Sequence, residues 1–259
     1  MRSTTIKALI LDMDGVLWRD DQPIGDLSSI FAEISRRNLK VTLATNNATR
    51  SVEQYLMKLE RFGVMLEPEQ IVNSSLAAAH YLSRRFPEKG NVYIVGEEGL
   101  FSTLRKHGFV HSQENVLAVI GSLDRQLTFE KLNQATMIIR SGVPFIGTNP
   151  DRTFPTPDGL IPGAGSILAA IEAATQVQPV IVGKPSPEMY MVAIDRMKSS
   201  PAETLVVGDR LETDIIGAQQ LGCPTALVLS GVTGPAAASA WNPTPDYIVE
   251  DLTALLTVL

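Results

Sequence analysis

The stretch "ALILDMDGVLW", residues 8–18, joins an apolar run to two carboxylates. Its first four residues carry no polar side chain, which is typical of a strand buried on both faces of a sheet. Asp12 and Asp14 follow, and Gly15 comes directly after them. In an open α/β sheet, ligands bind beyond the carboxyl ends of the strands, so the stretch predicts a buried strand that ends at a site. An ordinary polar turn is the alternative interpretation of these residues at this point.

The same alternation of apolar runs and amphipathic segments continues along the chain. Strands are predicted at 6–11, 39–44, 70–75, 179–184, 204–209, 225–230 and 246–250, and helices at 24–38, 51–63 and 212–222. Nearly continuous apolar strands that alternate with helices indicate a parallel sheet covered on both faces. We therefore expect an α/β fold with a doubly wound, Rossmann-like parallel-sheet core.

The middle third of the chain has an alternation of its own. Strands are predicted at 91–96, 115–121 and 143–149, and helices at 98–107, 128–141 and 163–175. Residues 87–90 and 178–179 are rich in Pro, Gly and polar residues, which favours hinges there. We predict a catalytic core formed by 1–81 and 179–259, with a smaller α/β domain inserted at 82–178.

Composition narrows the possible partners and the compartment. Hydrophobic residues make up 44% of the 259 residues, and the net charge is -6. An acidic surface argues against nucleic acid and against an anionic membrane as partners. A single cysteine cannot form an internal disulfide, and the first apolar run is too short for a signal peptide or a membrane span. We expect a cytoplasmic protein that binds neither nucleic acid nor membrane.

A second polar motif follows the strand predicted at 39–44. Thr45 and Asn46 stand where that strand ends, in "LATNN". Hydroxyl, amide and backbone N–H groups at such a place can receive the oxygens of a phosphate group. The alternative is a helix N-cap and turn.

Two further motifs complete the series. Lys184 ends the apolar run of "IVGKPSP", and Asp209 and Asp214 lie in "VVGDRLETDI". Taken singly, the lysine has the character of a solvated charge at a sheet edge, and either acid can be a helix N-cap. Because all four motifs fall at predicted strand ends, we favour one shared site over four separate turns.

The chemistry of these side chains points to phosphoryl transfer. Four carboxylates brought together repel one another, which raises their pKa values, and a divalent cation relieves the repulsion. Oxygen ligands of this kind suit Mg²⁺, which with Lys184 forms a positive clamp for a phosphoryl group. Asp12 can attack phosphorus as a nucleophile, and Asp14 can protonate the leaving alcohol and later deprotonate water.

The ordered motifs resemble those of the haloacid dehalogenase superfamily of phosphohydrolases. D-x-D-G, a strand-end Thr, a Lys and G-D-x4-D occur in that order. The segments "DGVLW", "TNNATRS", "TNPD", "GKPSPEMY" and "GDRLETDI" are similar to the NagD-type branch, which includes p-nitrophenyl phosphatases and pyridoxal phosphatases. The resemblance extends over essentially the whole chain.

This resemblance implies a role for each residue of the series. Asp12 corresponds to the nucleophile, Asp14 to the acid/base with its backbone carbonyl on Mg²⁺, Thr45 and Asn46 to phosphate binders, Lys184 to the charge-neutralising cation, Asp209 to a side-chain metal ligand, and Asp214 to a support of the metal through water. Asp14 and Thr45 are only 31 positions apart, whereas Thr45 and Lys184 are 139 apart. The insertion therefore corresponds to an α/β cap placed between Thr45 and Lys184.

Within the expected cap, the stretch "TNPDRTFPTPDG", residues 148–159, has the character of a shaped loop. By resemblance, the corresponding loop covers the mouth of the active site. Asn149, Asp151 and Arg152 would then hydrogen-bond a polar leaving group, and Phe154 would pack against a ring or exclude water. A plain surface connection is the alternative. Caps of this branch often mediate dimers, so a homodimer through the cap is a further expectation.

We expect a Mg²⁺-dependent phosphatase that hydrolyses small phosphate monoesters through a phospho-aspartyl intermediate. One alternative is a phospho-accepting signalling module, which needs neither Asp14 nor a large insertion. Another is a metabolite-binding protein without turnover, although every catalytic position is intact. The partner would be a small phosphorylated metabolite. Sugar, nucleotide, glycerol and glycolate phosphates and pyridoxal phosphate all fit the sequence.

Overall fold

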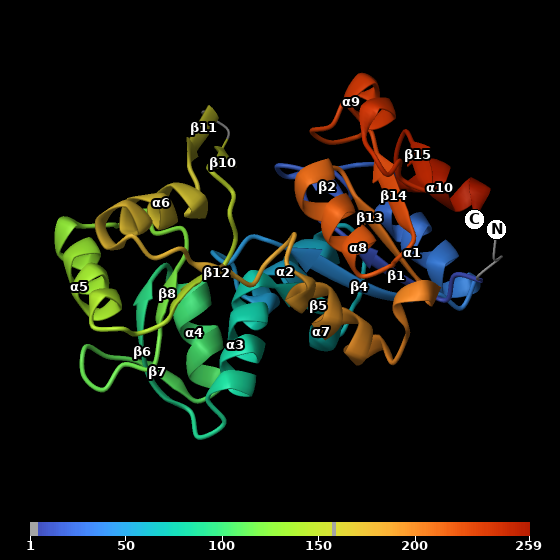
Figure 1. The fold of residues 1–259 in the computed structure, drawn as a ribbon. Coiled ribbons are helices and arrows are strands. Elements are labelled where there is room, and N and C mark those ends of the chain that lie inside the picture. The colour runs from blue at the N-terminus through green and yellow to red at the C-terminus, as the bar shows by residue number, and fades with distance from the viewer. Residues whose placement is uncertain (1–4, 157–158) are drawn as a thin grey trace. The chain divides into compact units, whose positions relative to one another are not determined.

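The computed structural model describes residues 5–156 and 159–259, which divide into two compact units (Figure 1). The first unit comprises the described residues up to Thr45 together with Val52–Val72 and Lys184–Leu259. The second comprises Asn46–Ser51 and Asn73–Gly183. Each unit has a sheet and a hydrophobic core of its own.

The first sheet has six strands, whose order shows where the site belongs. The order is β15 (Tyr247–Val249), β14 (Thr225–Val228), β13 (Thr204–Gly208), β1 (Ala8–Leu11), β4 (Lys40–Thr45) and β5 (Ile71–Asn73). Strand β1 pairs in parallel with both β13 and β4. The chain builds outward from β1 to β4 and β5, and later from β13 to β14 and β15 on the other side. The strand order therefore reverses between β1 and β13, and such a switch point is where open α/β sheets bind ligands.

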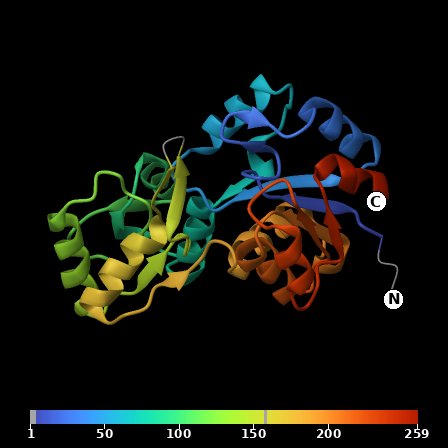
Figure 2. The ribbon, with the colours of Figure 1, turned by 90° about the horizontal axis from the view of Figure 1, so that it is seen from above.

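Helices cover both faces of this sheet, as the apolar strands predict. Figure 2 shows α1 (Leu27–Arg36) and α10 (Leu252–Val258) on one face, and α7 (Pro187–Met197) and α8 (Ile216–Gln220) on the other. The four residues of β1 are at most 1% exposed, because both of its faces are covered. The expected doubly wound α/β core is confirmed.

Short elements complete the first unit. They are β2 (Trp18–Arg19), β3 (Gln22–Pro23), α2 (Val52–Arg61), α9 (Pro235–Ala240), the 3₁₀ turns η1 (Pro68–Gln70) and η2 (Pro201–Glu203), and η3 (Leu211–Ile215), a single π-helical turn. Strands β2 and β3 form a small antiparallel hairpin directly after the two N-terminal carboxylates. The predicted helix at 212–222 is thus divided into η3 and α8.

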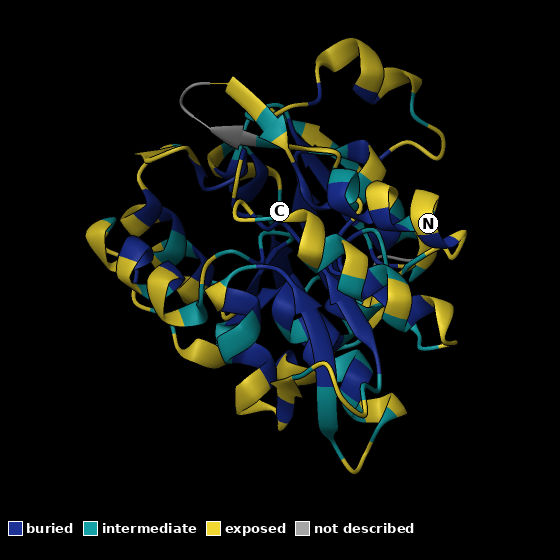
Figure 3. Cartoon of the chain, turned by 90° about the vertical axis from the view of Figure 1, so that its left-hand side faces the viewer, coloured by how far each residue is buried: buried dark blue, intermediate teal, exposed yellow. Residues whose placement is uncertain are grey.

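The second unit is a smaller parallel sheet with four helices. Its strands are ordered β12 (Val180–Ile181), β9 (Phe145–Gly147), β8 (Val119–Gly121), β6 (Gly90–Val95) and β7 (Phe109–His111). The helices are α3 (Ser74–Arg85), α4 (Glu98–Lys106), α5 (Phe129–Arg140) and α6 (Ala164–Thr175). Buried residues line the strands and exposed residues the outer sides of the helices (Figure 3). The expected second α/β unit is therefore present.

Its boundaries differ from the predicted 82–178. The unit already includes α3, because this helix packs against α4. It also includes β12, because Val180 and Ile181 pair with β9. The prediction that 179–184 forms a strand of the core sheet is therefore wrong, and Lys184 follows a strand of the second sheet. The chain passes between the units next to Thr45, Ser51, Val72 and Gly183, and not at the predicted hinges.

The stretch predicted as a shaped loop, 148–159, contains regular structure. Strand β10 (Thr153–Thr156) pairs antiparallel with β11 (Gly159–Pro162), and the hairpin packs on α6. Pro157 and Asp158 of the predicted loop lie outside the described residues. Phe154 faces Ile161 across the hairpin and packs on the core of the second unit. The prediction of an irregular loop is therefore wrong for Thr153–Thr156 and Gly159, which lie in the paired strands β10 and β11.

No helix within the described ranges has the length and apolar character needed to cross a membrane.

The second sheet depends on two glycines beneath helix α6. A Cβ atom at position 147 would lie 2.4 Å from Cδ1 of Leu168 and 2.8 Å from Cδ1 of Ile181. A Cβ atom at position 121 would lie 2.5 Å from Cδ2 of the same leucine. The absence of side chains at Gly121 and Gly147 therefore allows α6 to pack closely on β8 and β9.

We predict that Gly147→Ala lowers the free energy of unfolding by about 1–3 kcal/mol, because the added methyl overfills this contact. Urea unfolding measures the effect. In a Leu168→Ala background the same substitution should cost clearly less, because the methyl groups of Leu168, which include the nearest clashing atom, are gone. Equal costs in the two backgrounds would contradict the packing argument.

Candidate active site

Three of the predicted carboxylates meet at the switch point of the first sheet. Asp12 follows β1 and Asp209 follows β13, and the backbone N–H of Asp12 donates to the carbonyl of Val207 at 2.9 Å. One oxygen each from Asp12, Asp209 and Asp214 lies within 4.8 Å of the others. Asp14 is exposed and is not part of this cluster. The structure thus brings three of the four acids together, and their roles stay predictions.

Lys184 is the cation of this cluster. Its Nζ lies 2.6 Å from Oδ1 of Asp12 and 2.6 Å from Oδ1 of Asp214, and its side chain is only 4% exposed. It also donates to the carbonyl of Ala44, next to the end of β4, at 3.1 Å. Burial disfavours the charged amine, but the two carboxylates outweigh burial, so the pKa of Lys184 lies above its usual value. The lysine is a fixed positive charge.

For Asp12 and Asp209, burial outweighs the attraction of the lysine, so their pKa values also rise, which disfavours their charged form. Burial raises the pKa of Asp12 well above its usual value, even though Lys184 opposes the shift, and the nearby Asp214 adds to it. Burial, together with Asp214, raises the pKa of Asp209 to about 6. One lysine does not balance three crowded carboxylates, so the cluster favours a further cation.

Asp214 is held from two directions. Its Oδ2 accepts a hydrogen bond from the backbone N–H of Arg210 at 3.1 Å, while Oδ1 faces Lys184. The hydroxyl of Tyr190 donates to the backbone carbonyls of Thr213 and Asp214, at 2.9 and 3.0 Å. These contacts hold η3 against α7. Both oxygens of Asp214 are therefore engaged by the protein.

Asp209 differs because one of its oxygens is left over. Its Oδ2 accepts from the backbone N–H of Val232 at 2.7 Å. Its Oδ1 is buried and has no hydrogen-bond partner within the described residues. A buried carboxylate oxygen without a donor is costly unless a cation compensates it. The oxygen donors of the cluster are of the kind that Mg²⁺ prefers, so these residues fit a magnesium ion.

Three glycines make the close approach of the acids possible. A Cβ atom at position 231 would lie 2.0 Å from Oδ2 of Asp209, and one at position 15 would lie 2.6 Å from the same oxygen. A Cβ atom at position 208 would lie 2.2 Å from Cβ of Asp214. Sequence reasoning did not identify Gly208, Gly231 or Tyr190 as parts of the site. Gly208, directly before Asp209, could have been noticed in the sequence. The requirement for glycine there comes from its contact with Asp214, which forms only in the folded chain.

Thr45 and Asn46 are neighbours in sequence but belong to different units. Thr45 ends β4 and is 3% exposed, directly after the carbonyl that Lys184 contacts. The carbonyl of Asn46 accepts from Oγ of Ser74 at 2.6 Å and from Nδ2 of Asn149 at 2.8 Å. Phosphate binding by Thr45 and Asn46 stays a prediction.

The residues expected to contact the leaving group lie in the second unit. Asn149 is buried, and its Oδ1 accepts from the backbone N–H of Asp151 at 3.1 Å. Asp151 in turn accepts from Nδ2 of Asn46 at 3.2 Å, so these residues form one network. Arg152 is exposed and Phe154 is partly buried. The network favours a structural role for Asn149. That these four residues determine substrate specificity stays a prediction.

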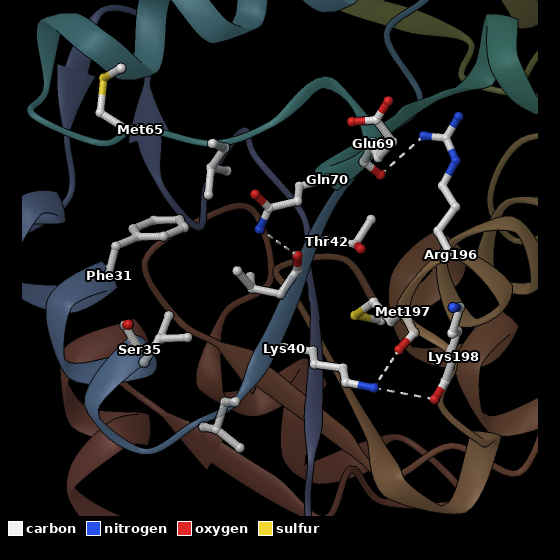
Figure 4. Close-up of a pocket in the computed structure, with 14 residues that line it drawn as sticks. Phe31, Ser35, Lys40, Thr42, Met65, Glu69, Gln70, Arg196, Met197 and Lys198 are labelled. Atoms are coloured by element: carbon white, nitrogen blue, oxygen red, sulfur yellow. Dashed lines mark hydrogen bonds between the residues drawn. The ribbon is translucent and has the colours of Figure 1, made fainter.

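A concave region lies at the amino end of β4, away from the acids. A pocket of about 570 Å³ opens beside the start of β4, lined by residues that include Phe31, Met65 and Gln70 (Figure 4). Two of the positively charged side chains that line the pocket stabilise the fold through hydrogen bonds to backbone carbonyls. Lys40 donates to the carbonyl of Met197 at 2.7 Å, and Arg196 donates to the carbonyls of Glu69 and Ile71. This pocket is at the amino end of β4, whereas the acids lie beyond the carboxyl ends of their strands.

Comparisons with known proteins agree with this geometry. Residues 9–110 match the sequence model of haloacid dehalogenase-like hydrolases, and residues 181–255 match a second model of hydrolases of this type. The chain is 34% identical to a Staphylococcus aureus protein named acid sugar phosphatase. The aligned 254 residues cover 98% of each chain.

Solved structures of similar proteins share the whole fold. The p-nitrophenyl phosphatase from Archaeoglobus fulgidus superposes with a TM-score of 0.92 at 31% identity, covering 98% of this chain and 100% of the other. NagD from E. coli K-12 gives 0.89 at 32% identity, covering 96% and 97%. A glycerol phosphate phosphatase from Mycobacterium tuberculosis, in complex with magnesium, gives 0.89 at 34% identity, covering 96% and 76%. The cluster of acids and lysine at the switch point, the inserted second unit and these matches lead to one conclusion: the chain belongs to the haloacid dehalogenase-like hydrolases and is a phosphatase similar to NagD and the p-nitrophenyl phosphatases.

Proposed function

We propose that the protein is a Mg²⁺-dependent phosphatase of small phosphate monoesters that acts through a phospho-aspartyl intermediate. The observation that carries the proposal is the buried Asp12 carboxylate, which is paired with Lys184 and has a carboxylate oxygen of Asp209 within 4.8 Å. Oδ1 of Asp209 has no hydrogen-bond partner among the residues that the structure describes. A nucleophile beside a fixed cation and a spare metal ligand is the arrangement that phosphoryl transfer requires.

The residues that would hold the ion are Asp12 and Asp209 through their side chains and Asp14 through its backbone carbonyl. Asp214 would act through water, which agrees with both of its oxygens being engaged by the protein. When bound, Mg²⁺ supplies positive charge that neutralises the carboxylates and the phosphoryl oxygens. The magnesium complex of the M. tuberculosis relative and the acid cluster of this chain support the assignment.

Lys184 and the end of β4 would receive the phosphate group. Lys184 is held by Asp12, Asp214 and a carbonyl before any substrate arrives, so its charge is already in place. Preorganised charge of this kind lowers the barrier because it needs no rearrangement during the reaction. Thr45 would add its hydroxyl group, and Asn46 its amide.

The reaction would proceed in two balanced steps. In the first, an oxygen of Asp12 forms a bond to phosphorus, the bond from phosphorus to the ester oxygen breaks, and Asp14 donates a proton to the leaving alkoxide. In the second, Asp14 takes a proton from water, whose oxygen attacks the phosphorus. The bond to Asp12 then breaks, which releases inorganic phosphate and restores both acids.

The chain's own residues count against the two alternatives without turnover. A phospho-accepting signalling module has no need of an acid at position 14, two residues after the nucleophile, or of a second unit. A metabolite-binding protein has no need of a nucleophile beside a fixed cation. Multiple turnovers of p-nitrophenyl phosphate, dependent on Mg²⁺ and abolished by EDTA, separate catalysis from both alternatives.

The relatives define the substrate classes to test. They are named for sugar phosphates, p-nitrophenyl phosphate and glycerol phosphate, which are all small monoesters. The core's acids and Lys184 would contact only the phosphate group, so selection among these esters must use groups that reach the leaving alcohol. We propose the second unit as the source of those groups, with Phe154 the first to test.

We predict that Asp12→Asn and Asp14→Asn both abolish steady-state turnover, for different reasons. The first removes the nucleophile. The second leaves attack possible with a good leaving group, but no base remains to activate water, so phosphorylated Asp12 should accumulate. Mass spectrometry after incubation with p-nitrophenyl phosphate and Mg²⁺ detects the added phosphate group. Steady-state rates like those of the wild type in either variant would refute the assignment.

We predict that Asp209→Asn stabilises the protein in EDTA at about pH 8, and that the gain shrinks toward about pH 5. The sign follows from the pKa of Asp209, which is about 6 in the folded protein and therefore above its value in the unfolded chain. The contribution of Asp209 to the free energy of unfolding is fully present at pH values below the pKa of the unfolded chain. It is lost as the pH rises through the pKa of the folded protein. Asparagine avoids that loss.

Saturating Mg²⁺ should reverse the order, because an ion that binds only the folded state stabilises the wild type more than the variant. Thermal or urea unfolding of both proteins, with and without Mg²⁺, measures the difference. A variant that gains as much from Mg²⁺ as the wild type would remove Asp209 from the metal site.

We predict that Phe154→Ala changes the ranking of substrates in a panel of sugar, glycerol and p-nitrophenyl phosphates by about 1–3 kcal/mol in relative kcat/KM. Phe129→Ala is the matched control, because Phe129 belongs to the same unit and is exposed. A uniform loss on all substrates, or no change, would show that Phe154 is not a selecting residue.

A further inference from the structure

Asp14 stands apart from the other acids because it is exposed and its carboxylate is held by a neighbouring side chain. Its Oδ1 accepts a hydrogen bond from the indole Nε1–H of Trp18 at 2.8 Å. An exposed aspartate samples several side-chain conformations unless a contact selects one. The group that selects the conformation of Asp14 therefore affects any proton transfer in which Asp14 takes part.

The backbone brings Trp18 back to Asp14 within four residues. The N–H of Gly15 donates to the carbonyl of Trp18 at 2.8 Å, and the N–H of Leu17 donates to the carbonyl of Met13 at 2.8 Å. Gly15 has a φ of 83°, a left-handed conformation that glycine adopts without strain. This closed turn joins the end of β1 to β2 and sets the indole beside the carboxylate.

The indole ring is itself fixed. Trp18 is 1% exposed, and Nζ of Lys58 on α2 lies 4.3 Å from its ring centroid. Lys58 is buried as well, donates to the carbonyl of Asp20 and lies 3.3 Å from the carboxylate of Asp21. The ring centroid of Phe62, directly after α2, lies 6.1 Å from that of Trp18. The donor is thus held by the packing of α2.

We propose that Trp18 is a positioning residue for Asp14: its indole N–H holds one carboxylate oxygen, so that the other oxygen remains directed at the leaving group and at the attacking water. Lys58 keeps the indole in place. The proposal rests on the function of Asp14 as acid and base. A misplaced acid lowers the rate because proton transfer requires hydrogen-bond distance to the reacting oxygen.

Trp18 can instead be read as a residue that only fills the core and whose indole N–H takes the nearest acceptor. Trp18→Phe separates the two readings, because it keeps a ring over Lys58 but removes the N–H donor. Trp241→Phe is the matched control. It replaces the chain's other tryptophan, which belongs to the same unit and whose Nε1–H donates to Gln219 at 3.4 Å.

The readout is the dependence of kcat/KM on the leaving group, with p-nitrophenyl phosphate and phenyl phosphate as two substrates of similar shape. Nitrophenolate leaves with little help, whereas phenolate, with a pKa of about 10, needs a proton. Trp18→Phe should lower kcat/KM for phenyl phosphate by about tenfold or more, and should lower it for p-nitrophenyl phosphate much less. Trp241→Phe should leave the ratio unchanged. An equal loss on both substrates would overturn the proposal.

A double-substitution cycle gives the second test, and its readout is the rate at which Asp12 becomes phosphorylated in a single turnover, because Asp14→Asn is expected to abolish steady-state turnover. In an Asp14→Asn background, Trp18→Phe should cause no further loss on phenyl phosphate, because the group it positions is gone. A further loss as large as in the wild type would mean that Trp18 acts through packing alone. If Asp14→Asn itself leaves the leaving-group dependence unchanged, the proposed acid function fails; if only Trp18→Phe leaves it unchanged, the positioning role fails.

Nuclear magnetic resonance tests the contact without altering Trp18. The chain has two indole N–H groups, and Trp241→Phe identifies the one that belongs to Trp18. Asp14→Asn should shift this resonance, because a hydrogen bond to a carboxylate is stronger than one to an amide oxygen. An unshifted Trp18 resonance would show that the hydrogen bond is absent in solution, and would overturn the proposal even if Trp18→Phe failed to fold.

Discussion

The ion pairs of the buried Lys184 are the interaction on which the rest of the site depends. Its amine contacts Asp12 after β1, the carbonyl of Ala44 in β4 and Asp214 in η3, so one side chain joins three segments far apart in sequence. A buried charge is tolerated only when it is paired, and removing one partner of such a pair costs about 3–5 kcal/mol. The site therefore forms only where these three segments meet in the folded unit.

The charge balance of the cluster explains why these residues suit a bound cation. Three carboxylates surround one lysine, and the pKa values of Asp12 and Asp209 are raised as a result of burial and of their neighbours. Because Gly15 and Gly231 have no side chains, the backbone lies close to one carboxylate oxygen of Asp209. The other oxygen has no hydrogen-bond donor among the described residues. The fold thus maintains an electrostatic imbalance that a divalent cation and a phosphate group would together relieve.

Two aspartates separated by one residue have opposite surroundings, which is how one short motif can serve two chemical roles. Asp12 is enclosed and faces a fixed cation, which places the proposed nucleophile beside a charge that can receive the oxygens of a phosphoryl group. Asp14 is exposed and is held by an indole N–H, which suits a group that exchanges protons with alcohol and water. The turn between β1 and β2 produces this difference, because it sends consecutive side chains into different environments.

The doubly wound core and the convergence of Asp12, Asp209 and Asp214 could be predicted from the sequence, because apolar runs mark buried strands and parallel strands place their carboxyl ends at one edge. The motif order likewise indicated the family and the two-unit organisation. Only the tertiary structure decided that β12 joins the second sheet, that α3 belongs to the second unit and that β10 pairs with β11. It also decided that Asp14 lies outside the carboxylate cluster, beside Trp18, and that Gly208 and Gly231 are required by contacts with the acids. The physical reason is that local patterns specify which segments are strands and where they end, whereas pairing partners and close contacts depend on residues that meet only after folding.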